Sequence, residues 1–294
     1  MEERIIISLT TYSKRIVNIP AVLDTIFSQT LKPDLVVLNM AFEEIIPEEV
    51  QKYIDTHNVE VYRVPDTKVY KKLLPTLKRY PNDCIITIDD DFLYPKGMIE
   101  EFVSIHNIWP DHPISGNKEV NFGMLCHCGC ASLTKACYYG EFLEYINDEV
   151  IQKCPSDDLV YTFGANKSGH PYISTNSLYF LNMQSYNEGE GYSLLTVCEN
   201  GIVDTYKYLS TKFGNIDNNM DVYFKYLNNK SQIDLLIGVL RTLFEKEAYE
   251  KGFEKGRELV YSTKSYKLGN AIIRGLSRFK NILLKVLCSS DKTS

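Results

Sequence analysis

The chain of 294 residues is long enough for one large domain with an appendage. Its 44% hydrophobic and 24% charged residues are ordinary for a globular protein and exclude a disordered or fibrous one. The net charge of −6 argues against general nucleic-acid binding, because a protein that binds nucleic acid usually presents a basic surface.

Strands and helices alternate over the first ninety residues. Short apolar runs, rich in β-branched residues, predict buried parallel strands at 4–9, 35–40, 59–64 and 84–89. Helices are predicted between them at 19–31, 47–58 and 71–80, the first from apolar residues spaced by three and four. This order is typical of an α/β domain with a mostly parallel sheet.

The pattern is less regular after residue 92. We expect helices at 97–109 and 140–154, a strand at 121–129, and a loop-rich stretch with isolated short segments over 156–205. From about residue 217 the sequence turns helical, with charges on most faces over 245–258, which favours a solvated helix over a coiled-coil contact.

Three consecutive carboxylates, Asp89, Asp90 and Asp91, follow the strand at 84–89. Open α/β sheets bind ligands at the carboxyl ends of their strands. In an extended chain Asp89 and Asp91 point to the same side and Asp90 to the other, and such a pair can hold Mg²⁺ or Mn²⁺. The alternative is a solvated turn in which Asp90 caps a backbone amide. We favour the metal site.

A second acidic pair is Asp157-Asp158. Taken by itself, the pair is best explained by helix capping, with Ser156 or Asp157 as the N-cap of a following helix. The functional alternative is a general base that deprotonates an acceptor hydroxyl. Local sequence does not decide whether this pair lies near the acidic triplet.

The cysteines form one cluster, Cys126, Cys128 and Cys130, among eight in the chain. A zinc site with His127 or Cys137 as fourth ligand is one interpretation, but zinc sites usually combine two separated ligand pairs. Small buried thiols on a strand are the favoured interpretation. The N-terminal MEERIIISLTTY lacks the features of a secretory signal, so we expect reduced thiols and a cytoplasmic location.

Several segments resemble nucleotide-sugar-dependent glycosyltransferases of the GT-A fold, close to family 2, and in particular a bacterial subgroup of surface-polysaccharide synthesis. The specific matches are IIISLTTYSKRI, LDTIFSQTLKPDLVVLNM and YKKLLPTLKRYPNDCIITIDDDFLYPKGMIEEF, with weaker ones at CGCASLTKACYYG, SDDLVYTFGANKSG, 193–204 and SYKLGNAI. The resemblance implies a three-layer α/β/α catalytic domain over 1–215, followed by a helical extension at 216–263 and a basic amphipathic tail at 264–294.

The resemblance also implies roles for individual residues. Asp89 and Asp91 match the family's D-x-D motif, which binds Mn²⁺ or Mg²⁺ at the donor diphosphate, and Asp158, beside Asp157, matches the catalytic base of an inverting transfer. The implied substrate-binding residues are Thr10, Thr11, Tyr12, Arg15, Asn39, Asp66, Lys71 and Asp90. For Arg15 a surface charge is almost as good an explanation, and solvated lysines are the safer one for Lys71 and Lys72. The sequence departs from the family at Asn39, where many members have Asp, and over 126–132.

The implied reaction is hexosyl transfer from a nucleotide-sugar donor to a glycan or lipid-linked glycan acceptor. A nucleotidyltransferase acting on sugar phosphates is the rival enzyme class, but the loop TTYSKR lacks the glycine that its phosphate loop usually has. A non-catalytic sugar-nucleotide-binding protein is the other rival, and the intact Asp89, Asp91 and Asp158 argue against it.

The tail at 264–294 carries seven Lys or Arg residues and one Asp, a net charge of +6, which leaves −12 for the rest of the chain. Apolar residues recur in it at helical spacing. Such a helix over 264–285 either lies on an anionic membrane, which would place the protein at the inner face of the cell membrane, or packs against the acidic domain. The pattern leaves both open.

Overall fold

The computed structural model describes residues 3–116, 120–121, 124–175, 184–185 and 201–216. Apart from residue 216, the expected helical extension at 216–263 and the basic tail at 264–294 lie outside these residues, so both stay predictions. Within the described ranges, no helix combines the length and the apolar character needed to cross a bilayer.

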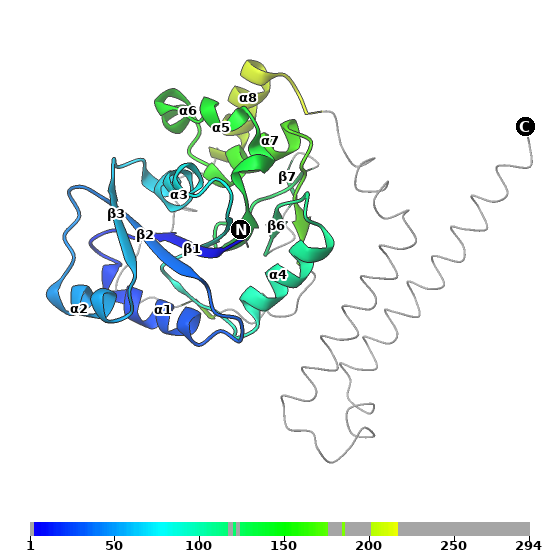
Figure 1. Ribbon diagram of the computed structural model, residues 1–294. Coiled ribbons are helices and arrows are strands. Elements are labelled where there is room, and N and C mark those ends of the chain that lie inside the picture. The colour runs from blue at the N-terminus through cyan, green and yellow to red at the C-terminus, as the bar shows by residue number, and fades with distance from the viewer. Residues whose placement is uncertain (1–2, 117–119, 122–123, 176–183, 186–200, 217–294) are drawn as a thin grey trace, which may run out of the picture. The chain divides into compact units, whose positions relative to one another are not determined.

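A seven-stranded sheet with the order β10-β6-β9-β4-β1-β2-β3 forms the centre of the described domain (Figure 1). All neighbouring strands are parallel except β9, which is antiparallel to both β4 and β6. The strands are β1 (Ile5–Thr10), β2 (Leu35–Ala41), β3 (Glu60–Val64), β4 (Cys84–Ile88), β6 (Ile114–Ser115), β9 (Ala131–Thr134) and β10 (Ile173–Ser174). The predicted mostly parallel sheet and its first four strands are therefore confirmed.

Helices cover both faces of this sheet, and each face has its own apolar cluster (Figure 1). One face carries α1 (Ile19–Phe27), α2 (Glu48–Thr56) and α4 (Met98–Ile108). The other carries α3 (Leu74–Arg79), α5 (Phe142–Tyr145), α6 (Asp148–Lys153), α7 (Asp157–Lys167) and α8 (Gly201–Phe213). The three-layer α/β/α arrangement expected from the sequence is confirmed.

Short elements complete the described part. Two small antiparallel pairs join β5 (Phe92–Leu93) to β11 (Gln184–Ser185) and β7 (Val120–Asn121) to β8 (Met124–Leu125). Single 3-10 turns are η1 (Ile16–Asn18), η2 (Lys68–Lys72) and η3 (Ala136–Tyr139).

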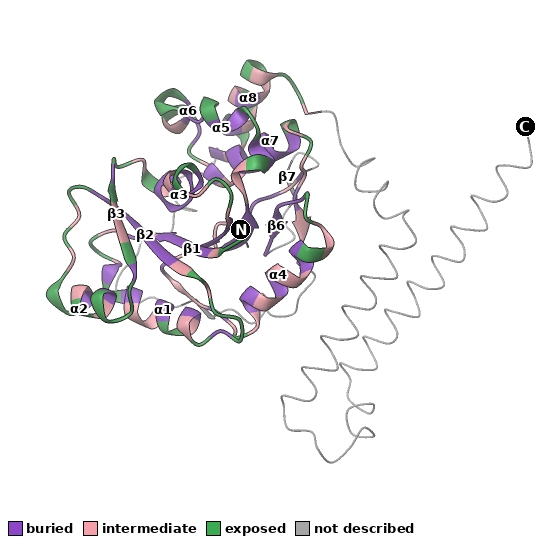
Figure 2. Ribbon diagram, viewed as in Figure 1, coloured by how far each residue is buried: buried purple, intermediate pink, exposed green. Residues whose placement is uncertain are grey.

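The central strands are apolar on both sides because both sides are covered. In β1, Ile7 and Leu9 enter the cluster under α1 and α4, whereas Ile6 enters the cluster under α3 and α7. Figure 2 shows the same strands as buried along most of their length. Because side chains alternate along a strand, this double burial requires the unbroken apolar runs of the sequence.

Four expectations need correction. The helix predicted at 140–154 is broken between α5 and α6, because Asn147 starts a new helix by accepting hydrogen bonds from the amides of Glu149 and Val150. The strand predicted at 121–129 shrinks to the hairpin β7–β8. The stretch at 156–205, expected to be loop-rich, contains the long helix α7, and the helix predicted at 71–80 is split into η2 and α3 around Leu73.

Candidate active site

The ends of β1 and β4 bring two segments together at one edge of the sheet. These strands are parallel neighbours, with Ser8 opposite Thr87, so the residues that follow both strands emerge side by side. The Thr11 hydroxyl donates to Oδ2 of Asp90 at 2.7 Å. The acidic triplet and the loop after the first strand, which were predicted separately, therefore form one site.

Asp89 is held by a buried lysine. Nζ of Lys72 donates to Oδ1 of Asp89 at 2.5 Å and to the carbonyl of Gly129 at 3.0 Å. Burial alone would lower the pKa of Lys72, but the nearby carboxylates of Asp89, Asp157 and Asp158 raise it above its ordinary value. Lys72 is therefore a fixed positive charge, and the expectation of a solvated lysine is wrong.

Asp90 and Asp91 share a guanidinium group. Nη1 of Arg15 lies 3.0 Å from Oδ1 of Asp90 and 2.9 Å from Oδ2 of Asp91. The chain turns at these two aspartates, so the alternation expected for an extended segment, with Asp90 opposite Asp91, is wrong. Burial, followed by repulsion from Asp89, raises the pKa of Asp91 to about 6.

The second acidic pair opens α7. The Ser156 hydroxyl accepts the amide of Leu159 and is the N-cap, which leaves both aspartates free of that role. Burial raises the pKa of Asp157 and of Asp158, and each carboxylate lies close enough to Asp89 to feel its charge.

Gly129 connects the two acidic groups. A Cβ atom at Gly129 would lie 2.9 Å from Nζ of Lys72 and 3.2 Å from Oδ1 of Asp158. Asp158 and the Lys72–Asp89 ion pair therefore flank the same backbone position. The question that local sequence left open, whether the acidic pair lies near the triplet, is settled: it does.

The other predicted substrate-binding residues contact one another or neighbouring protein groups. Thr10 donates to the carbonyl of Asn39 at 2.7 Å, while the Asn39 side chain is fully buried and donates to Thr76 at 2.8 Å. Lys71 is buried against the exposed Asp66 in an ion pair, which corrects its interpretation as a solvated lysine. The Arg15 guanidinium lies over the ring of Tyr12, with Cζ 5.6 Å from the centre of that ring. Their contacts to a substrate stay predictions.

The acidic triplet offers oxygen ligands to a cation. Lys72 and Arg15 each occupy one oxygen of their partner, which leaves Oδ2 of Asp89 and Oδ1 of Asp91 without a hydrogen bond among the described residues. Carboxylate oxygens are the ligands that Mg²⁺ and Mn²⁺ prefer. The assignment of a divalent cation to Asp89 and Asp91 stays a prediction.

The cysteine cluster does not assemble a zinc site in the described residues. The sulfur atoms of Cys128 and Cys130 lie 2.7 Å apart as free thiols, and no third ligand joins them. In the same residues, the ligand-type side chains that do gather within 4.8 Å are Glu3, Cys84 and His106. Cys84 begins β4 whereas Asp89 follows its end, so that group lies at the opposite edge of the sheet.

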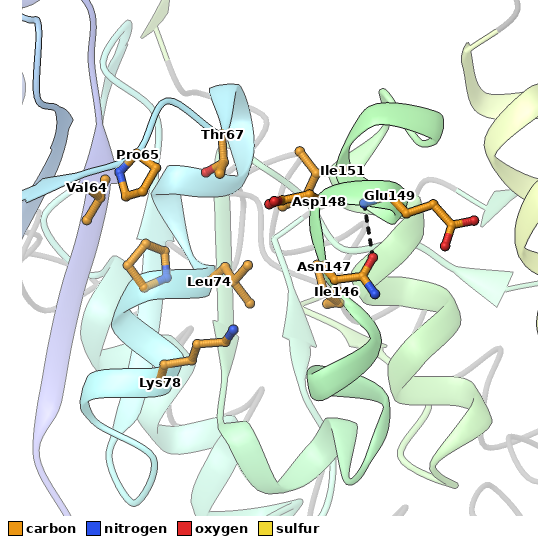
Figure 3. Close-up of a pocket in the computed structure, with 11 residues that line it drawn as sticks. Val64, Pro65, Thr67, Leu74, Lys78, Ile146, Asn147, Asp148, Glu149 and Ile151 are labelled. Atoms are coloured by element: carbon orange, nitrogen blue, oxygen red, sulfur yellow. Dashed lines mark hydrogen bonds between the residues drawn. The ribbon is translucent and has the colours of Figure 1, made fainter.

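A cavity of about 500 Å³ lies between the β3–α3 segment and α6 (Figure 3). Val64, Leu74, Ile146 and Ile151 give it apolar walls, and Lys78, Asp148 and Glu149 are at its polar parts. None of the five clustered aspartates lines it. It is therefore separate from the carboxylate site.

The sequence did not predict that three residues belong to this site. Lys72 was expected in solvent, Gly129 was not singled out, and His127 was considered only as a zinc ligand. His127 is fully buried beside Asp158, with Nε2 lying 4.0 Å from Oδ1. The available signal was the position of His127 and Gly129 inside the cysteine cluster, which drew attention to sulfur instead.

Comparisons with known proteins agree with this fold. No family model matches the chain, and no curated protein matches it. The structure is similar to that of the mannosyltransferase PcManGT from Pyrobaculum calidifontis in complex with GDP-Man and Mn²⁺, with a TM-score of 0.52 and 15% identity over 92% of this chain and 84% of that one. At this identity the likeness shows the fold, and it supports the expected GT-A type.

Two further structures are more distant. TarS from S. aureus has a TM-score of 0.48 and 12% identity over 73% of this chain and 40% of that one. A cytidylyltransferase from Leptospira borgpetersenii has a TM-score of 0.43 and 15% identity over 74% of this chain and 98% of that one. Neither is similar enough to decide between glycosyl and nucleotidyl transfer.

Proposed function

We propose that this protein is a metal-dependent glycosyltransferase that moves a sugar from a nucleotide-diphosphate donor to a hydroxyl group of an acceptor. One observation carries the proposal: Asp89 and Asp158, far apart in sequence, flank the same Lys72–Gly129 contact at the edge of the sheet. Sugar transfer needs one carboxylate group for the donor's cation and another for the acceptor's proton.

The donor side of the site is the acidic triplet with the loop after β1. Asp89 and Asp91 would hold Mn²⁺ or Mg²⁺, which when bound offsets the negative charge of the leaving nucleoside diphosphate. Arg15 presents its guanidinium beside this position, and Tyr12 offers an aromatic face for a base. That a protein with a similar fold was crystallised with GDP-Man and Mn²⁺ supports this assignment.

The acceptor side is Asp158. Its carboxylate takes the proton of the acceptor hydroxyl as that oxygen attacks the anomeric carbon, while the bond from this carbon to the diphosphate oxygen breaks. Attack from the face opposite the leaving group inverts the configuration. Burial, followed by repulsion from Asp157, raises the pKa of Asp158, which makes its carboxylate a stronger base than that of an aspartate in water.

The acceptor class rests on the resemblance of the sequence. Enzymes of the similar subgroup build surface polysaccharides, so we propose a glycan or a lipid-linked glycan as acceptor and a hexose as the transferred sugar. A lipid-linked acceptor would place the protein at the inner face of the cell membrane, with the basic segment 264–285 as its contact to anionic lipid.

A panel of nucleotide sugars tests the proposal. Each is added to the full-length protein with Mn²⁺, and thermal stabilisation identifies the donor, since binding to the folded state raises its stability. With that donor and an acceptor, we expect release of the nucleoside diphosphate. Consumption of added pyrophosphate, with formation of a nucleoside triphosphate and a sugar phosphate, would show a nucleotidyltransferase, and stabilisation without any turnover across a panel of glycan acceptors would favour a sugar-nucleotide-binding protein.

A further inference from the structure

One ring nitrogen of His127, Nε2, faces the proposed base Asp158. Its side chain is fully buried, and Nε2 lies 4.0 Å from Oδ1 of Asp158. Neither of these two buried atoms has a hydrogen-bond partner among the described residues. A buried polar atom without a partner is destabilising because it has lost its hydrogen bonds to water, so two such atoms that face each other need a physical explanation.

The other nitrogen of His127 is anchored in a chain of hydroxyl groups. Nδ1 lies 2.9 Å from the Tyr172 hydroxyl, which lies 2.7 Å from that of Tyr139, which lies 2.8 Å from Oγ1 of Thr134. If each hydroxyl donates to the next group, from Thr134 through both tyrosines to Nδ1, every hydroxyl proton in the chain has an acceptor. That direction leaves the proton of the imidazole on Nε2, the atom that faces Asp158.

The backbone of His127 is tied to the same turn of α7. Its amide donates to Oγ1 of Thr162 at 2.7 Å, and Thr162 donates to the carbonyl of Asp158 at 2.6 Å. The two facing side chains are therefore carried by backbone segments joined through one hydroxyl. Burial, followed by the positive charge of Lys72, holds the pKa of His127 well below its usual value, so the ring is neutral.

The carboxylate of Asp158 has one oxygen turned inward and one left for a ligand. Its side chain is 42% exposed, yet Oδ1 is closed to water. The accessible surface of the carboxylate therefore belongs to Oδ2. An acceptor hydroxyl that approaches from solvent meets Oδ2, while Oδ1 faces His127.

We propose that His127 is a positioning residue for Asp158, donating from Nε2 to Oδ1 so that Oδ2 is held toward the acceptor hydroxyl. This inference rests on the proposed glycosyltransferase function. The 4.0 Å separation is longer than a hydrogen bond, and catalytic hydrogen bonds that are long in a free enzyme commonly shorten when substrate is bound. A neutral donor fixes the carboxylate without neutralising it, so the carboxylate keeps its ability to accept a proton.

Two substitutions separate the two nitrogens. The amide of His127→Asn reaches the place of Nδ1 and keeps the contact to Tyr172 but has nothing at Nε2, whereas the longer His127→Gln places its amide near Nε2. We expect His127→Asn to lower kcat by about 10- to 100-fold with an unchanged KM for the donor, and His127→Gln to recover part of the loss. His112→Asn, at a buried histidine bonded through Nδ1 to Pro171, is the matched control and should leave kcat unchanged.

The pH profile tests the hydrogen bond itself. A donor to Oδ1 stabilises the ionised carboxylate, so its removal should raise the pKa of Asp158 and move the acid limb of kcat to higher pH. Tyr172→Phe, which frees the ring tautomer, should move this limb in the same direction, and it provides the test if His127→Asn fails to fold.

The outcomes for His127 and for the proposed function are distinct. An acid limb and a kcat that stay at the wild-type values in a folded His127→Asn or Tyr172→Phe protein would overturn the role of His127, while turnover by the wild-type enzyme still supports the function. Failure of the wild-type protein to transfer sugar from any donor would instead contradict the function.

Discussion

Nζ of Lys72 lies 2.5 Å from Oδ1 of Asp89, and only 8% of the lysine side chain is exposed. The ammonium also contacts the Gly129 carbonyl and lies within the field of Asp157 and Asp158. One buried positive charge thus holds together carboxylates from β4 and α7. Without it, their mutual repulsion in a poorly hydrated site would oppose folding.

Removal of this charge should destabilise the protein. Breaking one partner out of a buried ion pair costs about 3 kcal/mol or more, because the remaining charge stays buried without compensation. We expect Lys72→Met to lower the free energy of unfolding in urea by about this amount, and Lys72→Arg to lower it less. Lys78→Met, at an exposed lysine of α3, is the control and should change little. Equal stabilities of the Lys72→Met and Lys78→Met proteins would show that the ion pair contributes nothing.

The acidic pair of α7 should make stability depend on pH. Burial raises the pKa of Asp157 above its ordinary value of 3.8, so the folded state binds this proton more tightly than the unfolded state. The stability that results is fully present below about pH 3.8 and is lost as the pH rises through the raised value.

Asp157→Asn removes this dependence. We expect the variant to be more stable than the wild-type protein at about pH 7 and similar to it at about pH 3.5, in urea unfolding at both values. Asp148→Asn, in the first turn of the neighbouring helix but exposed, should show no such difference. A variant that is less stable than the wild-type protein at neutral pH would mean that Asp157 is stabilised in its ionised form.

Substitution of alanine for two glycines should affect different properties, activity at Gly129 and stability at Gly164. A Cβ at Gly129 would press on Lys72 and Asp158, whereas a Cβ at Gly164 would lie 2.3 Å from the Phe142 ring in the core. We expect Gly129→Ala to reduce sugar transfer about tenfold or more with little loss of stability, and Gly164→Ala to cost about 2 kcal/mol of stability by overpacking. Turnover and urea unfolding of both variants check this. Normal turnover by Gly129→Ala would remove Gly129 from the site.

The assignment of the cation to Asp89 and Asp91 is tested by Asp91→Asn. The variant loses one carboxylate ligand, so we expect stabilisation by Mn²⁺ together with the nucleotide-sugar donor to disappear. Asp204→Asn, at an exposed position on α8, is the control and should bind as the wild-type protein does. Unchanged Mn²⁺-dependent donor binding by Asp91→Asn would contradict the metal assignment.

The sequence predicted those elements whose burial leaves a regular pattern. Strands β1 to β4 are unbroken apolar runs because helices cover both faces of the sheet. The start of helix α7 was indicated by its N-cap at Ser156, but its length was not predicted, because residues 159–166 are buried all round and no period of 3.6 is visible. Strand β9, with the short and partly polar Ala131–Thr134, is held mainly by its antiparallel pairing to β4 and β6, which no local pattern encodes.

The candidate site was predicted in its parts but not in its connections. Asp89 and Asp91 are visible in the sequence because an isoleucine-rich strand delivers them to the edge of the sheet. The contact of Lys72 with Gly129 depends instead on how η2 packs against the segment after β8, so the lysine looked like a surface residue. The same long-range packing brings His127 to Asp158.

The most direct test of the proposed reaction is the rate of nucleoside diphosphate release by Asp158→Asn, measured at donor and Mn²⁺ concentrations that saturate the variant. Asparagine keeps the shape of the side chain but accepts no proton. We therefore expect saturation at wild-type donor concentrations and a rate about a thousandfold lower in the presence of acceptor. Release at the wild-type rate would contradict the role of Asp158 as the base, and with it the central claim that this carboxylate takes the proton of the acceptor hydroxyl.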